Sequence, residues 1–81
     1  MRDEIIKIEG IYVPTGRRGN IDPAHVDRMA QDILRNGQQS PIMVRWDGSR
    51  HVLVEGLHRL EACKALGEDT ISAVIVQARK R

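Results

Sequence analysis

Cysteine is nearly absent from this chain, because Cys63 is the one thiol in 81 residues. A single cysteine excludes an internal disulfide framework and a thiolate metal cluster built within one chain. Apolar runs are short as well, and none approaches the roughly 18 consecutive apolar residues of a membrane span. The first residues, Met1–Ile5, carry acids at once and lack the apolar stretch of a secretory signal. We therefore expect one cytoplasmic domain over residues 1–81, stabilised by packing alone.

Aromatic residues are also scarce, since Tyr12 and Trp46 are the only two in the sequence. A platform that stacks single-stranded nucleic acid needs several aromatic rings, so we expect these two to pack on a core or strand face.

The formal net charge of +2 is too small to indicate a partner by itself. Positive charge gathers at Arg17-Arg18, in a glycine-flanked loop, and at Arg79–Arg81. Both clusters can approach phosphates, and both can equally be solvated; we interpret the terminal cluster as a solvated tail.

The apolar runs and the turn residues predict the element order β-α-β-β-α-β and a small α+β domain with helices packed on a mixed sheet. Helix starts are marked by Asp22-Pro23 and Gly56, and helix ends by Gly37 and Gly67. The expected segments are a strand over residues 5–13, a loop over 15–20, a helix over 23–36 with an apolar stripe at Val26, Met29, Ala30, Ile33 and Leu34, an antiparallel strand pair over 42–46 and 51–54, a helix over 57–66, and a largely covered strand over 71–76.

The junction Gly56-Leu57-His58-Arg59 turns the fourth expected element directly into a helix. The first backbone N–H groups of a helix have no intrahelical partners, and the helix dipole makes that end positive. Glycine allows a close backbone approach, and the guanidinium of Arg59 is a forked donor suited to phosphate oxygens. These features predict an anion site at the start of the second long helix.

Arg59 shares a helical face with Ala62, Cys63 and Leu66, the residues that this helix is expected to bury. A guanidinium on the core-facing side of a first turn needs a partner. Two alternatives remain open from spacing alone: a structural carboxylate, Asp47 or Glu55, or an incoming anion. Cys63 lies on the same side and is expected to be a small buried hydrophobe.

His58 can donate to a phosphate or act as an acid or base, with Glu55 or Glu61 as an assisting carboxylate. The plainer alternative is a partly exposed surface histidine, because no orienting partner is adjacent in sequence. His25 and His51 are isolated from each other and from Cys63 in spacing. We therefore expect no protein metal site, although a metal can arrive with a nucleotide.

The stretch VEGLHRLEACKALG, residues 54–67, resembles the second-helix motif of the ParB/sulfiredoxin superfamily. Three further landmarks match that superfamily in order along the chain: Arg17-Arg18 before a helix begun by Asp22, the passage Gly37–Val44 of the type G-x-x-x-P-I-x-V, and the closing strand Thr70–Val76. The resemblance covers almost the whole chain and implies a single ParB N-terminal-like, or ParB-like nuclease, domain.

The resemblance implies that Gly56, Leu57, His58 and Arg59 bind the phosphates of a nucleotide such as CTP, ATP or ADP, with Mg²⁺ accompanying it. It also implies that Arg17 or Arg18 closes over the ligand. Members of the superfamily act in DNA partitioning or as nucleotide hydrolases, nucleases or phosphotransferases. The implied partners are therefore a phosphate ligand and DNA or a DNA-bound protein, with a homodimer as a further option.

The sequence departs from sulfiredoxin at Leu57, which stands where that enzyme has its catalytic cysteine. Leu57 has no nucleophile, so sulfinic-acid reductase activity is not expected. These residues also contain no helix-turn-helix that would read an operator. Three functions remain open: a nucleotide-binding module that works with DNA, a small phosphotransfer or nuclease-type enzyme using His58 and Glu55, and a protein-interaction module with a vestigial pocket.

Overall fold

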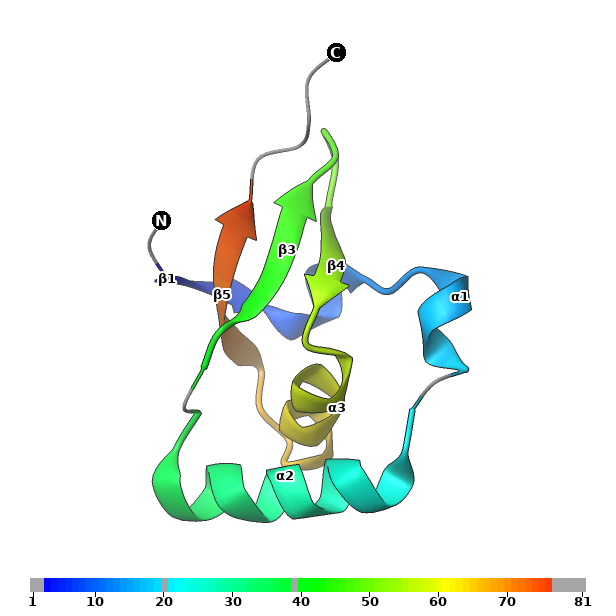
Figure 1. Ribbon diagram of the computed structural model, residues 1–81. Helices are drawn as coiled ribbons and strands as arrows, with labels where there is room; N and C mark the ends of the chain where they lie inside the picture. The colour runs from blue at the N-terminus through cyan, green and yellow to red at the C-terminus, as the bar shows by residue number, and fades with distance from the viewer. Residues whose placement is uncertain (1–2, 20, 39, 77–81) are drawn as a thin grey trace.

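A five-stranded mixed sheet with helices on one side forms the domain in the computed structural model, which describes residues 3–19, 21–38 and 40–76 (Figure 1). The elements in chain order are β1 (Asp3–Lys7), a 3₁₀ turn η1 (Ile8–Gly10), β2 (Ile11–Tyr12), α1 (Thr15–Arg18), α2 (Pro23–Asn36), β3 (Ile42–Trp46), β4 (His51–Glu55), α3 (Leu57–Ala65) and β5 (Thr70–Val76). The predicted α+β class is confirmed.

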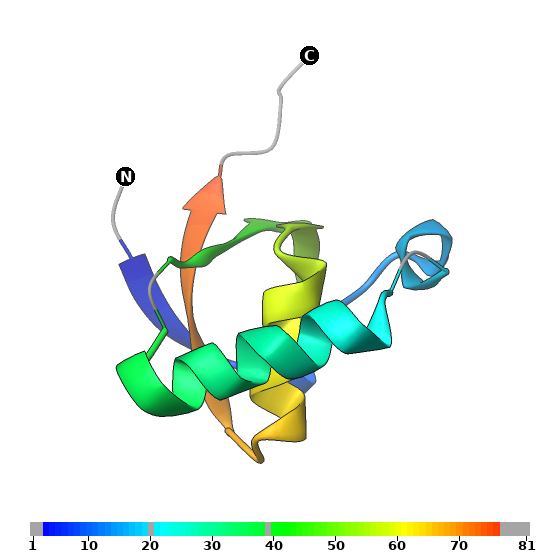
Figure 2. The same ribbon diagram turned by 60° about the horizontal axis from the view of Figure 1, so that its bottom comes forward.

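The strands lie in the order β1-β5-β3-β4-β2. The pairs β1/β5 and β3/β4 are antiparallel, whereas β5/β3 and β4/β2 are parallel. In Figure 1, α3 lies between the sheet and α2, and Figure 2 shows α2 crossing α3 on that same side. None of the helices in the described ranges is long and apolar enough to cross a membrane.

The first expected strand, residues 5–13, is in fact two strands at opposite edges of the sheet. β1 pairs with β5 as far as Lys7 opposite Thr70, the first residue of β5. Ile8 then donates its backbone N–H to the carbonyl of Asp69 at 3.0 Å and buries its side chain. Because β5 offers no strand beyond that point, the chain turns through η1 and crosses to β4 as β2. The prediction of one continuous strand was therefore wrong.

The expected loop over residues 15–20 contains a short helix, α1, at Thr15–Arg18. Arg17 and Arg18 therefore belong to a helical turn rather than to an extended loop. Their side chains lie outside the described part of the structure, as do Asn20 and the terminal cluster Arg79–Arg81.

α2 begins as predicted, since the side chain of Asp22 accepts a hydrogen bond from the backbone N–H of Ala24 at 3.1 Å and Pro23 follows the cap. Its buried residues are Ala30 and Ile33. Leu34, which the apolar stripe placed in the core, is 75% exposed. α2 packs mainly against the single helix α3, which covers a narrower stripe of its surface than a sheet would cover. Leu34 lies outside that stripe.

The predicted turn between β3 and β4 is confirmed, and the side chain of Asp47 holds it. Asp47 Oδ1 accepts the backbone N–H groups of Ser49 and Arg50, both at 2.9 Å. The first of these hydrogen bonds is the main reason that the pKa of Asp47 is lowered.

The two aromatic residues flank this hairpin on its surface. Trp46 meets the ring of His51 edge-on, and the guanidinium carbon of Arg50 lies 3.8 Å from the centre of the Tyr12 ring.

β5 buries Ile71 and Ala73, whereas Ser72 and Val74 are half-buried. The continuous apolar sequence predicted that both faces would be largely covered, but the structure covers one face more fully than the other. Beyond the start of β3, the side-chain amide of Gln38 takes the place of a neighbouring strand. It accepts the N–H of Ser72 and donates to the carbonyl of Ser72, both at 3.0 Å. This amide satisfies backbone groups of β5 that no strand reaches.

Gly56 joins β4 to α3 in a left-handed conformation, with φ of 108°. A Cβ atom at this position would lie 2.7 Å from Cγ2 of Ile42 and 2.9 Å from its Cβ. Ile42 is one of the most deeply buried residues in the core and cannot move aside easily. Gly56 is therefore required by the backbone conformation and by the packing of β3.

Gly56→Ala should destabilise the domain by about 2 kcal/mol or more, because it adds steric overlap with Ile42 to the strain of a positive φ. Gly67→Ala is the matched control: Gly67 has φ of 79°, but nothing lies within 4 Å of a Cβ there. It should cost about 1 kcal/mol, from strain alone. Urea unfolding of both variants measures the difference. Equal losses would contradict the role assigned to Ile42.

Candidate functional site

The first turn of α3 presents backbone donors that the protein does not use. The first helical bond runs from the N–H of Leu60 to the carbonyl of Gly56 at 2.9 Å. Among the described residues, the N–H groups of Leu57, His58 and Arg59 donate no hydrogen bond, and no side chain caps this end. The turn therefore carries free N–H groups at the positive end of a nine-residue helix.

Arg59 lies on the predicted face of α3, beside the buried Ala62 and Cys63. Its Nε atom is buried and has no hydrogen-bond partner among the described residues. The carboxylate alternatives do not supply one: Asp47 pairs with Arg50, at 3.5 Å between Oδ2 and Nε, and no ion pair joins Arg59 to Glu55. A buried guanidinium nitrogen without an acceptor lowers the stability of the fold. An anion that reached this nitrogen would supply the missing acceptor.

A small hollow opens at Arg59 and is lined by Pro41, Met43, Glu55, Gly56 and Arg59, from the ends of β3 and β4 and the start of α3. Its volume is about 190 Å³. Pockets that enclose a whole drug-sized ligand occupy about 300–1,000 Å³. This hollow is below that range, so it has room for a small group such as a phosphate but not for a whole nucleotide.

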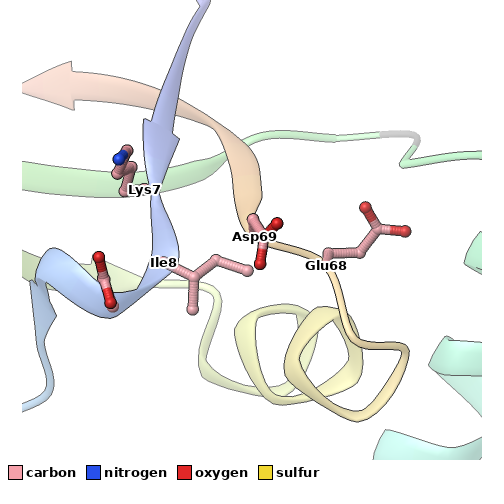
Figure 3. A pocket seen from close by; sticks show the side chains of 5 residues that line it. Lys7, Ile8, Glu68 and Asp69 are labelled. Carbon is pink, nitrogen blue, oxygen red and sulfur yellow. The ribbon is translucent and has the colours of Figure 1, made fainter.

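A larger hollow of about 360 Å³ lies at the other end of α3, lined by Lys7, Ile8, Glu9, Glu68 and Asp69 (Figure 3). Three carboxylates and one ammonium line this hollow, and the C-terminal end of the helix dipole is negative. An anion is therefore disfavoured at this end despite the greater volume. Within the described ranges, no group of three or more His, Cys, Asp or Glu side chains can hold a metal ion either.

His58 connects α3 to α2. Its Nε2 accepts the backbone N–H of Asp22 at 3.0 Å, and its ring meets that of His25 edge-on, with the centroids 4.6 Å apart. Because Nε2 is an acceptor, this bond requires a ring that is unprotonated at Nε2. The contact brings the N-terminal ends of α2 and α3 together, so the positive poles of two helices converge beside the turn.

The structure separates the two predicted catalytic side chains. Glu55 lines the hollow with Arg59, whereas His58 is absent from that lining and its Nε2 is bound to Asp22. The alternative carboxylate, Glu61, lies 3.4 Å from Lys64 in a surface ion pair. The catalytic assignments of His58 and Glu55 stay predictions.

Leu57 points into the core and is only 8% exposed, so it can reach a ligand only through its backbone N–H. Cys63 is buried as expected, and burial raises the pKa of its thiol, with the carboxylate of Glu68 acting in the same direction. A thiol with a raised pKa is a poor nucleophile at neutral pH. Cys63 therefore does not replace the cysteine that the turn lacks.

The profile of the ParB N-terminal domain matches residues 3–81 of this sequence. The chain belongs to the ParB N-terminal domain family. This match confirms the family resemblance inferred from the segment VEGLHRLEACKALG. No curated protein gives a significant sequence match to this ParB N-terminal domain.

Solved structures share the fold over nearly the whole chain. Sulfiredoxin from Arabidopsis thaliana is 28% identical with a TM-score of 0.88, covering 96% of this ParB N-terminal domain and 88% of its own chain. Truncated ParB from Caulobacter crescentus, complexed with CTP-γ-S, is 18% identical with a TM-score of 0.84, covering 99% of this chain and 47% of ParB. A free serine kinase mutant in complex with ADP is 14% identical with a TM-score of 0.80. The match covers 94% of this chain and 31% of the kinase chain.

Sequence reasoning missed Pro41 and Met43 as neighbours of Arg59. Pro41 precedes β3 and Met43 lies opposite Glu55 in the β3/β4 register, so both reach the hollow through strand pairing. The G-x-x-x-P-I-x-V passage of this ParB N-terminal domain was the available signal. Taken alone, that passage indicates the order of the fold and does not indicate which of its residues line the hollow.

Replacing His58 should loosen the contact between the two helix starts. His58→Phe keeps a ring but removes the acceptor for the Asp22 N–H, and should cost about 1 kcal/mol of unfolding free energy. His51→Phe is a suitable control, because His51 contacts Trp46 on the hairpin surface instead. Hydrogen exchange at the Asp22 amide should accelerate in His58→Phe alone. Unchanged exchange would show that the bond does not hold α2.

Proposed function

We propose that this domain binds the phosphate of a nucleotide at the β4–α3 turn and acts with DNA or a DNA-bound partner. The observation that carries the proposal is the buried, unpartnered Nε of Arg59 beside the free N–H groups of Leu57 and His58. A phosphate oxygen would satisfy these donors together. The hollow lined by Gly56 and Arg59 has the volume for that one group.

The choice of a nucleotide is supported by what related folds bind. Truncated ParB was solved with CTP-γ-S, and the serine kinase mutants with ADP or AMP. CTP, ATP and ADP are therefore the ligands we propose for this chain. Glu55 adds a negative charge to the hollow, which a Mg²⁺ ion carried on the phosphates would offset.

The proposed partners follow from the same family. We propose that Arg17 or Arg18, in the α1 turn that precedes α2, closes over the ligand, and that DNA or a DNA-binding protein is the larger partner. The chain spans about half the length of the ParB structure that it matches, so the activity of a whole ParB protein is a proposal here. A cytoplasmic location accords with such partners. A second copy of the chain is a further proposed partner.

Isothermal titration with CTP, ATP and ADP, with and without Mg²⁺, tests the binding site. Wild-type protein should bind at least one nucleotide, and Arg59→Ala should weaken that binding by about tenfold or more, because a charge-assisted hydrogen bond is lost. Arg28→Ala removes an exposed arginine from α2 and should leave the affinity unchanged. If no nucleotide binds, or if none raises the unfolding temperature, the vestigial-pocket function replaces this one.

A phosphotransfer or nuclease-type enzyme is the second candidate, favoured by the presence of the Glu55 carboxylate in the same hollow as Arg59. We expect binding without turnover, because His58 is held by Asp22 and the turn has no nucleophile. Product formation from a nucleotide or DNA with Mg²⁺ is the measurement, on wild type, His58→Ala and Glu55→Gln. Turnover that either substitution abolishes would establish the enzyme instead.

A further inference from the structure

The sheet ends in two edges of very different length. β2 contributes two residues to one edge, whereas β1 contributes five, Asp3–Lys7, to the other. Figure 2 shows β1, in blue, as the outer strand beside β5. A long edge strand carries a row of backbone donors and acceptors that can pair with another strand. β1 therefore offers the longer template for association.

The hydrogen bonds of β5 show which groups of β1 face outward. Ser72 lies opposite Ile5, but both of its backbone groups are bonded to Gln38, on the other side of β5. Ile8, in contrast, donates its N–H to Asp69 across the same ladder. Since antiparallel pairs alternate between bonded and non-bonded, the N–H and C=O groups of Asp3, Ile5 and Lys7 point away from β5.

The side chains of these three residues share the face of the sheet opposite the core and are exposed, with Ile5 69% exposed. Their order is acid, isoleucine, lysine, with the two charges of opposite sign at equal distances from Ile5. We propose that two copies of this chain associate through β1, antiparallel, about a two-fold axis at Ile5. Asp3 then lies opposite the partner's Lys7, and Ile5 opposite Ile5 of the partner subunit.

This arrangement satisfies charge and hydrogen bonding together. The three outward residues of each strand form bonded pairs with the partner, giving about six backbone hydrogen bonds, and both charged pairs are attractive. Charges on an edge strand usually discourage pairing. A parallel in-register pairing would indeed place Asp3 beside Asp3 of the partner subunit, and Lys7 beside the partner's Lys7. The two-fold antiparallel pairing is the one that converts the same charges into attraction.

Charge reversal tests the pairing directly, with sedimentation velocity over a concentration series at low salt. Asp3→Lys and Lys7→Asp should each raise the dimer dissociation constant by about tenfold or more, since each changes two symmetric pairs. The double variant Asp3→Lys with Lys7→Asp should return it to within about threefold of wild type. Asp27→Lys makes the same charge change on the exposed face of α2 and should leave dimerisation unchanged.

Ile5→Pro removes an outward N–H without breaking a bond to β5, so it should fold and remain monomeric. Thermal unfolding confirms the fold of each variant. A wild-type chain that stays monomeric at millimolar concentration would overturn the proposal. So would a dimer that ignores the charge reversals and Ile5→Pro, because its interface would lie elsewhere. The test does not depend on the nucleotide site, which β1 does not line.

Discussion

The close approach of Gly56 to Ile42 determines where everything else in the candidate site lies. Because no Cβ stands between them, β4 can turn into α3 directly over the start of β3. That turn sends Leu57 and Leu60 into the core and brings Arg59 to the rim beside Glu55. A side chain at Gly56 would push α3 away from β3, and the free N–H groups and the guanidinium would no longer converge.

Two polar contacts between distant segments complete this arrangement. His58 accepts the N–H of Asp22 and thereby joins the starts of α2 and α3. Gln38, just after α2, holds the backbone of Ser72 in β5. α2 is thus tied to α3 at one end and to the sheet at the other, and its own buried surface is correspondingly small.

The features predicted correctly from the sequence are those that local chemistry decides. The Asp22 cap, the Asp47 turn, the glycine helix ends and the face of α3 that carries Arg59 all follow from a few adjacent residues. The errors arise where distant partners decide. The first strand breaks because β5 begins at Thr70, and Leu34 is exposed because a single helix packs against α2. The partner of His58 was likewise invisible, since Asp22 is 36 residues away in sequence.

The turn carries hydrogen-bond donors but no side-chain nucleophile. Leu57 is packed into the core and offers no nucleophile, and the Cys63 thiol is buried with a raised pKa. What remains is a set of donors with no acceptor in the described part of the chain: three backbone N–H groups and the Nε of Arg59. Such donors distinguish a phosphate from a neutral ligand but do not distinguish one base from another. Under the proposed function, selectivity among nucleotides would therefore come from residues outside the hollow of Pro41, Met43, Glu55, Gly56 and Arg59.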